Sequence, residues 1–238
     1  MSSHPLKAIF FDAAGTLFTV NGSVGEIYAR LASDYGKEVT VADLEAGFRR
    51  CFAKAPPMAF PSVSPEQIPV LEKQWWWNLV QNVFASLGVF PQFAAYFEAL
   101  FSHFARADAW RLYPETVETL VTLQTRGLQL GIISNFDSRL FGLLDGLGLA
   151  HFFDSVVIST QVGAAKPETA IFAQALGRHH LRPDEALHVG DSYEADIIGA
   201  QSAGLTPVLV DRRVPEQKID TYPRIKSLAE LLEIVDKY

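Results

Sequence analysis

The segment Lys7–Phe18, which reads KAIFFDAAGTLF, decides the fold that we expect for this chain. Its apolar run Ala8–Phe11 does not alternate polar and apolar residues, which is typical of a strand buried on both faces of a parallel sheet. Asp12 follows at the carboxyl end of this strand, where ligands bind in open α/β sheets. Small residues keep the next turn narrow, and Gly15 can take a positive φ that leaves backbone amides free to face an anion. A lone Asp can also be a simple turn former, so its role depends on the rest of the chain.

The remainder of the chain divides into a helical part and an alternating part. Residues 21–110 are predicted to be helical, with Ser23 and Thr40 as N-caps and helices at 24–35, 41–54, 76–87 and 93–105. From Leu112 onward strands alternate with helices, which predicts βαβ units and a parallel sheet. The expected strands are 128–133, 155–158, 186–189 and 206–210, and the expected helices are 114–127, 138–146, 167–178, 194–203 and 228–235.

The composition is that of an ordinary soluble globular protein. Its 238 residues, 49% of them hydrophobic, suffice for one large domain or for a core with a smaller companion. With 27 acidic and 20 basic residues, the chain has no basic surplus to neutralise a phosphate backbone, so nucleic-acid binding is disfavoured. A small phosphorylated substrate is compatible with this charge. The composition is compatible with either a monomer or a homodimer.

Three features bear on the cellular compartment. Cys51 is the only cysteine, which excludes an internal disulfide and a thiolate zinc site and suits a reducing, cytoplasmic setting. Residues 1–7 have neither the charged nor the apolar region of a signal peptide. Residues 74–97 carry no charge and are long enough to span a bilayer, but their amide side chains, Gly88 and Pro91 favour a pair of soluble helices. We therefore expect no contact with a membrane.

Polar residues follow three later strands, as Asp12 follows the first. They are Ser134 and Asn135 after strand 128–133, Lys166 after strand 155–158, and Asp191 with Asp196 after strand 186–189. Because the carboxyl ends of parallel strands meet at one edge of a sheet, we expect all of them beside Asp12. Each has a structural alternative, as a helix cap or as a solvated surface charge. Their coincidence in the correct order favours a common site.

Carboxylates gathered at this edge predict a metal. They repel one another unless a cation neutralises them, and Mg²⁺ suits hard oxygen ligands, keeps waters and takes one or two carboxylates plus a phosphate. The candidate ligands are the carboxylates of Asp12, Asp191 and Asp196 and the main-chain carbonyl of Ala14.

The other polar residues suit a phosphoryl group. Lys166 and the cation would offset its charge, while Ser134, Asn135 and Thr16 are the candidates to bind its oxygens. Asp12 would then attack the phosphorus in line. The candidate catalytic residues are therefore Asp12 and Lys166.

These spaced motifs resemble the haloacid dehalogenase-like (HAD) hydrolase superfamily over essentially the whole chain. The matching residues are Asp12–Leu17 (DAAGTL), Ser134–Asn135, Lys166–Pro167, and Gly190–Asp191–Ser192 with Asp196 and Gly199–Ala200. The resemblance implies a Rossmann-like α/β core, a parallel sheet with helices on both faces, formed by residues 1–20 and 111–238. It also implies that residues 21–110 form an all-helical C1 cap that closes over the substrate.

A narrower resemblance concerns residues 18–28 and 53–57, which look most like the REG-2-like group of the superfamily. It implies a Mg²⁺-dependent hydrolase of a small phosphorylated metabolite, with a phosphoaspartyl intermediate on Asp12 and no settled substrate. The cap residues that are candidates to face the cleft are Tyr28, Arg49, Lys54, His103 and Asp108. Trp75–Trp77 are expected to pack, because a helix points them in three directions.

Ala14 departs from the pattern of the family's phosphatases, which carry a second Asp here as general acid and base. General acid–base help contributes roughly 10²- to 10⁴-fold, or about 3 to 5 kcal/mol of barrier, so ordinary phosphomonoesterase activity should be weak. One account is a phosphatase restricted to leaving groups that depart without protonation, or one that takes an acid from the cap.

Two other accounts stay open, and a dehalogenase fits less well than either. Phosphonoacetaldehyde hydrolase also has Ala at this position and uses a cap lysine as a Schiff base, for which Lys54 is the candidate here. The second account is a catalytically weak protein that binds a phosphate ligand. A 2-haloacid dehalogenase also lacks the second Asp, but it needs no metal and would leave Asp191 and Asp196 unexplained.

Overall fold

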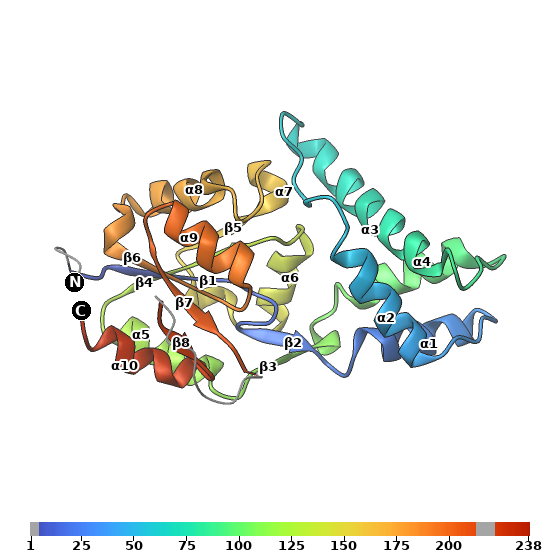
Figure 1. Ribbon diagram of the computed structural model, residues 1–238, viewed down its shortest axis with the longest axis horizontal. Helices are drawn as coiled ribbons and strands as arrows, with labels where there is room; N and C mark the ends of the chain where they lie inside the picture. Colours follow the sequence, from blue (N-terminus) through green and yellow to red (C-terminus); the bar gives the residue numbers. More distant parts are fainter. Residues whose placement is uncertain (1–4, 213–221) are drawn as a thin grey trace.

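The computed structural model describes residues 5–212 and 222–238 (Figure 1), so residues 1–4 of the N-terminal segment considered above lie outside it. Its described residues form a parallel six-stranded sheet in the order β5-β4-β1-β6-β7-β8. The strands are β1 (Ala8–Phe11), β4 (Gln129–Ser134), β5 (Ser155–Ile158), β6 (Ala186–Gly190), β7 (Thr206–Val210) and β8 (Arg224–Ile225). The predicted α/β class with a parallel sheet is confirmed. Of the six strands of this sheet only β8 was not predicted, because two residues are too few to show a period.

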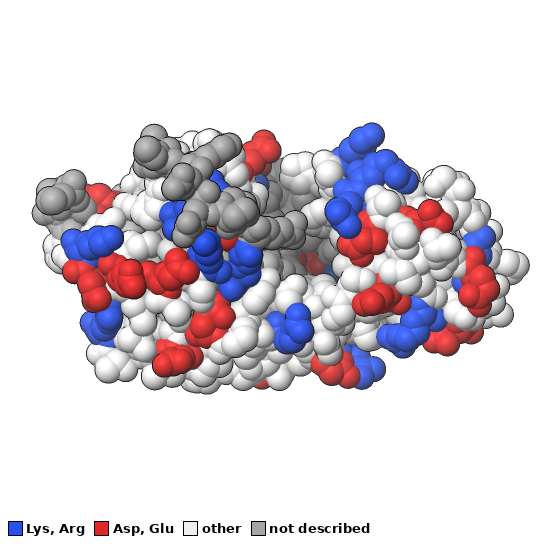
Figure 2. All heavy atoms as spheres, turned by 60° about the horizontal axis from the view of Figure 1, so that its bottom comes forward, with Lys and Arg blue, Asp and Glu red and all other residues white. Residues whose placement is uncertain are grey.

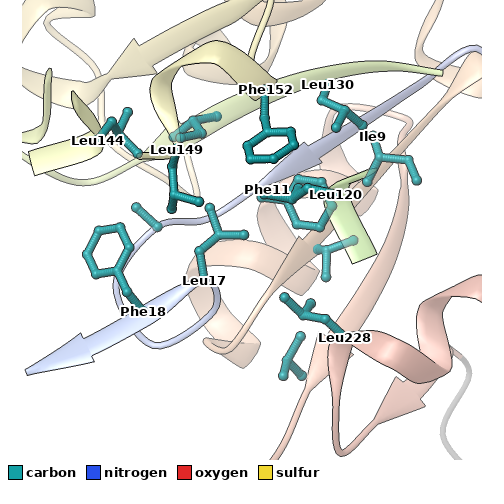
Figure 3. Packing of buried hydrophobic residues seen from close by; sticks show 14 of the residues in the cluster. Ile9, Phe11, Leu17, Phe18, Leu120, Leu130, Leu144, Leu149, Phe152 and Leu228 are labelled. Atoms are coloured by element: carbon teal, nitrogen blue, oxygen red, sulfur yellow. The ribbon is translucent and has the colours of Figure 1, made fainter. Parts of the chain in front are cut away.

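β1 lies at the centre of the sheet, as its composition predicts. Its four residues are fully buried, and it pairs in parallel with β4 on one side and with β6 on the other. Ile9 and Phe11 belong to the apolar cluster on one face (Figure 3), while Ala8 and Phe10 belong to the cluster on the opposite face. Burial of both faces explains why this strand lacks polar alternation.

Helices cover both faces of the sheet (Figure 1). α8 (Thr169–His179) and α9 (Gly199–Ser202) pack on the face that carries Phe10. α5 (Thr116–Thr125), α6 (Arg139–Gly146) and α10 (Leu231–Val235) pack on the opposite face. Short 3₁₀ turns lie at Pro65–Gln67, Ala107–Ala109, Ala150–Phe152, Pro183–Glu185 and Leu228–Glu230.

Four helices between β2 and β3 form a second unit, which we call the helical lobe (Figure 1). They are α1 (Val24–Asp34), α2 (Val41–Phe52), α3 (Ile68–Phe84) and α4 (Phe93–His103). Ser23 caps α1 in a capping box with Glu26, and the Thr40 side chain caps α2, so both predicted caps are confirmed. None of the helices in the described ranges combines the length and apolar character needed to cross a bilayer.

The chain enters and leaves the helical lobe through a two-stranded ribbon. β2 (Phe18–Val20) and β3 (Trp110–Leu112) pair antiparallel. The prediction of helix up to about Trp110 is wrong at this end. Strands of three residues whose partners are remote in sequence leave no local signal, so only the fold reveals them.

Polar contacts join the helical lobe to the core near the carboxyl edge of the sheet. The carboxylate of Glu72 in α3 accepts hydrogen bonds from the amide and the hydroxyl of Ser138, at 2.9 and 2.8 Å. The hydroxyl of Ser159, the first residue of α7 (Ser159–Val162), donates to the carbonyl of Met58 at 2.6 Å. These contacts fix the lobe over the strand ends.

Candidate active site

The ends of three strands and one loop bring four polar side chains together at the carboxyl edge of the sheet. Asp12 follows β1, Ser134 ends β4, Lys166 precedes α8, and Asp191 follows β6. The Ser134 hydroxyl donates to Oδ1 of Asp12 at 3.0 Å, and the Lys166 ammonium donates to the same oxygen at 2.7 Å. All four side chains line one cavity.

Asp12 is held by one of its two carboxylate oxygens. Both of its side-chain hydrogen bonds from described residues reach Oδ1, so Oδ2 is left for an incoming group. Asp12 is only 8% exposed, and burial raises the pKa of its carboxylate, an effect that the charge of Lys166 opposes. A buried carboxylate with one oriented and one open oxygen is suited to nucleophilic attack.

Lys166 lies between two carboxylates. Its Nζ donates to Oδ1 of Asp12 at 2.7 Å and to Oδ1 of Asp196 at 2.5 Å, and the side chain is almost completely buried. Burial alone would lower the pKa of Lys166, but the charges of the two aspartates outweigh burial and raise it. The ammonium is therefore charged at neutral pH and is directed at Asp12.

Asp196 is the second carboxylate that binds Lys166. It lies in a π-helical turn, Tyr193–Ile198, where the sequence predicts the start of an ordinary helix. Its Oδ1 accepts from Lys166 and from Nε2 of His188 at 2.8 Å, and its Oδ2 accepts from the amide of Ser192 at 2.9 Å. Burial would raise the pKa of Asp196, but Lys166 and His188 together lower it. Protein donors reach both oxygens, and through Oδ1 this carboxylate positions Lys166, while its role as a metal ligand stays a prediction.

Asn135 braces the loop that carries Lys166. Its side-chain amide donates to the carbonyl of Lys166 at 2.9 Å, and its Oδ1 accepts from the amide of Lys166 at 2.7 Å. Both ends of the amide are therefore engaged by the main chain, although the residue lines the cavity. Thr16 is fully buried, lies outside the lining of the cavity, and its hydroxyl has no partner among the described residues.

Asp191 lines the cavity together with Asp12 and Asp196. Burial, together with the charges of Asp12 and Asp196, raises the pKa of Asp191 to about 7. Gly15, at φ +97°, lets the turn after β1 approach this carboxylate, because a Cβ at Gly15 would overlap it. The Lys166 ammonium is already shared between Asp12 and Asp196, so among the described residues these carboxylates carry more negative charge than the protein neutralises.

This donor set fits Mg²⁺. The carboxylates of Asp12 and Asp191 and the carbonyl of Ala14 are hard oxygen donors beside one cavity. No cluster of three or more His, Cys, Asp or Glu side chains arranged to hold a metal occurs among residues 5–212 and 222–238. Two carboxylates with a main-chain carbonyl match an ion that keeps several waters and is not enclosed by protein.

A close backbone approach at Gly190 gives a first prediction. A Cβ at Gly190 would overlap the carboxylate of Asp196, whereas the space around Gly177 in α8 is open. We expect Gly190→Ala to lower the free energy of unfolding by about 1–3 kcal/mol, because the rigid carboxylate must move. Gly177→Ala should instead raise it by about 0.5–1 kcal/mol, through the better helix propensity of Ala. Urea unfolding of both variants measures this, and equal effects of the two would contradict the packing described here.

A cavity of about 450 Å³ lies over these groups, between the sheet edge and the helical lobe. Figure 2 shows the molecule hollowed between its two parts. The charged floor comes from the core, and the walls are mostly aromatic, with Tyr28, Phe48, Phe52, Trp76, Phe101 and Phe104 among them. Sequence reasoning missed this wall. The aromatic residues recur at helical spacing, which is the pattern of packing residues, and their second role depends on which side of each helix faces the core.

The lining of the cavity distinguishes among the five residues that the sequence offered as candidates to face the cleft. Tyr28 lines it, whereas Arg49, Lys54, His103 and Asp108 do not. Lys54 lines a different surface depression with Trp75. Trp75 and Trp77 make packing contacts, as expected, but Trp76 also lines the cavity and donates from Nε1 to Oδ2 of Asp137 at 2.6 Å.

Comparison with known proteins agrees with this fold. The model of the haloacid dehalogenase-like hydrolase family matches residues 6–204, and the chain belongs to this family. Haloacid dehalogenase-like hydrolase domain-containing protein 3 of Homo sapiens is 35% identical over 241 residues, covering 97% of this chain and 94% of that protein. A protein of Methanothermobacter thermautotrophicus named glyceraldehyde 3-phosphate phosphatase is 32% identical, covering 97% and 100%. The crystal structure of a HAD phosphatase from Thermococcus onnurineus superposes with a TM-score of 0.67 at 26% identity, covering 97% of this chain and 98% of that chain.

Proposed function

We propose that this protein is a Mg²⁺-dependent phosphatase that acts on small phosphate monoesters through an aspartyl-phosphate on Asp12. The observation that carries the proposal is the arrangement at the cavity floor, where the open oxygen of Asp12 lies beside the Lys166 ammonium and a second carboxylate, Asp191. Supporting it, an archaeal relative at 32% identity is named a phosphatase. In this proposal the helical lobe is the cap that encloses the substrate.

Each residue has a defined task in this reaction. The carboxylate of Asp12 attacks phosphorus, the bond from phosphorus to the ester oxygen breaks, and the leaving group departs with the electron pair. Lys166 offsets charge on the phosphoryl oxygens, and Ser134 keeps the attacking carboxylate oriented. Water then attacks the aspartyl-phosphate, releasing phosphate and restoring Asp12.

The metal would be held by Asp12, Asp191 and the carbonyl of Ala14. When bound, Mg²⁺ supplies charge neutralisation between the carboxylates and the phosphate. Asp196 accepts a hydrogen bond from Lys166 and keeps it in place, and Asp196 is itself held by hydrogen bonds from His188 and the amide of Ser192.

Ala14 limits the proposed substrates. A methyl group at this position cannot protonate a departing oxygen, so the leaving group has to be stable as an anion. The Schiff-base alternative has weaker support, because Lys166 is the only lysine among the described residues that line the cavity.

The leaving group gives the direct test of this function. With Mg²⁺ present, we expect kcat/KM for 4-nitrophenyl phosphate to exceed that for benzyl phosphate by roughly 100-fold or more, because only the nitrophenolate leaves without a proton. Initial rates of phosphate release measure both values. Asp12→Asn should reduce both rates to background, and chelation of the metal should do the same. Equal rates on the two esters would refute the role of Ala14.

Two rival functions predict different results. A binding protein would take up phosphate with Mg²⁺ and turn over neither ester. A 2-haloacid dehalogenase would release halide from 2-chloropropionate without metal and leave both esters intact.

A further inference from the structure

The wall of the cavity differs in chemistry from its floor. Among the described residues that line it, every side chain contributed by the helical lobe is aliphatic, a methionine or aromatic. The lobe brings two polar atoms, the hydroxyl of Tyr28 and the ring nitrogen of Trp76, and the latter already donates to Asp137. The part of a substrate that extends away from Asp12 therefore meets almost entirely apolar surface.

The one charged side chain on the wall is already engaged. Arg139, at the start of α6, donates from Nε and Nη2 to the carboxylate of Asp137 at 2.8 and 2.6 Å, and from Nη1 to the carbonyl of Phe101 at 3.2 Å. Its guanidinium also lies 4.1 Å from the ring centroid of Phe101 and 5.1 Å from that of Trp76. Neutralised and stacked in this way, Arg139 offers no free charge to a carboxylate or to a second phosphate.

We propose that the group esterified to the phosphate is an aromatic ring, so that the substrate is an aryl phosphate. This inference rests on the phosphatase function proposed above. A ring would pack against the aromatic side chains of the wall, which already contact one another edge-to-face, as Tyr28 does with Phe48, or stacked, as Phe52 does with Trp76. The hydroxyl groups of a sugar phosphate, or the carboxylate of a phosphorylated acid, would lose their water here without finding partners.

A second observation selects the same chemistry. Ala14 supplies no proton at the floor of the cavity, and a phenoxide is far more stable as a leaving anion than an alkoxide. The wall selects for an aromatic ring and the floor selects for an acidic leaving group, and an aryl phosphate satisfies both. The volume of about 450 Å³ accommodates a phosphate together with such a ring.

Binding of phosphonates tests this independently of turnover, because their carbon–phosphorus bond leaves no ester to hydrolyse. Phenylphosphonate carries the ring, methylphosphonate lacks it, and phosphonoacetate replaces it with a carboxylate. With Mg²⁺ present, we expect calorimetric titration to give a Kd for phenylphosphonate roughly 100-fold lower than for the other two, from burial of the ring. Similar affinities for all three would overturn the aryl substrate and leave the phosphatase proposal standing. Absence of binding by all three would overturn both.

A pair of matched variants locates the ring. Phe52 lines the cavity at its rim and is 48% exposed, while Phe141 is 37% exposed and lies outside the cavity lining, so both can be replaced without opening a core. Phe52→Ser should weaken phenylphosphonate roughly 3- to 10-fold and leave methylphosphonate unchanged. Phe141→Ser should change neither. An equal loss for both ligands in Phe52→Ser, or the same loss in Phe141→Ser, would show that the ring does not bind against this wall.

Discussion

Ala14→Asp is expected to raise kcat/KM for benzyl phosphate by roughly 10²- to 10⁴-fold, the usual contribution of a positioned general acid. Ala14 is only half-buried and lines the cavity, so a carboxyl group can be accommodated there. The same environment raises the pKa of Asp191 to about 7, through burial and through the neighbouring carboxylates. Burial and the neighbouring carboxylates would shift the pKa of a carboxyl introduced here in the same upward direction, which favours a general acid.

The substrate and a matched variant separate this effect from a general improvement. Turnover of 4-nitrophenyl phosphate should rise only slightly, because its leaving group needs no proton. Ala14→Asn, which has the size of Asp but no acidic proton, should give no gain on either ester. Initial rates for both esters and both variants measure this, and a gain with Asn, or an equal gain on the two esters, would show that Ala14 does not limit protonation.

Lys166→Met is expected to lower the free energy of unfolding by about 3–5 kcal/mol and to abolish most activity. The ammonium lies 2.7 Å from Asp12 and 2.5 Å from Asp196, with its side chain 2% exposed, so its removal leaves two buried carboxylates without their cation. The methionine keeps much of the packing volume, so the loss reports the charge. Urea unfolding at neutral pH, with phosphate release in parallel, measures both effects.

A second substitution distinguishes the two consequences. Lys166→Met combined with Asp196→Asn removes one of the unpaired charges and should recover part of the lost stability, while activity stays at the level of the single variant. Lys7→Met is the control, because the Lys7 ammonium pairs with Glu185 at the surface, where it is 51% exposed. It should change neither quantity appreciably. Recovery of activity in the double variant would show that Lys166 has no role beyond neutralising Asp196.

Much of the core follows from local pattern. The unbroken apolar run Ala8–Phe11 predicted a doubly buried strand, and β1 lies at the centre of the sheet. The β2–β3 ribbon and β8 could not be predicted, because their strands have three and two residues and their partners are remote in sequence. The π-helical turn at Tyr193–Ile198 also lacks a sequence signal, since its composition is that of an ordinary helix start.

The candidate site also has features that the sequence predicted and features that it could not predict. The spacing of the motifs predicted which side chains emerge near Asp12, because the carboxyl ends of parallel strands share one edge. Spacing could not predict that Asn135 engages the main chain of Lys166 or that protein donors occupy both oxygens of Asp196. Those roles depend on hydrogen-bond directions, which sequence does not carry.

By itself, then, the sequence determined the class of fold, the order of the strands that carry polar ends, and the absence of an acid at Ala14, because each of these follows from residue type and spacing along the chain. Only the tertiary structure decided that the aromatic residues of four separate helical segments face the same cavity and that the charge of Arg139 is cancelled there by Asp137. The physical reason is that an aromatic side chain at helical spacing is equally suited to packing and to binding. Which of the two it does is set by the surface that the fold places opposite it.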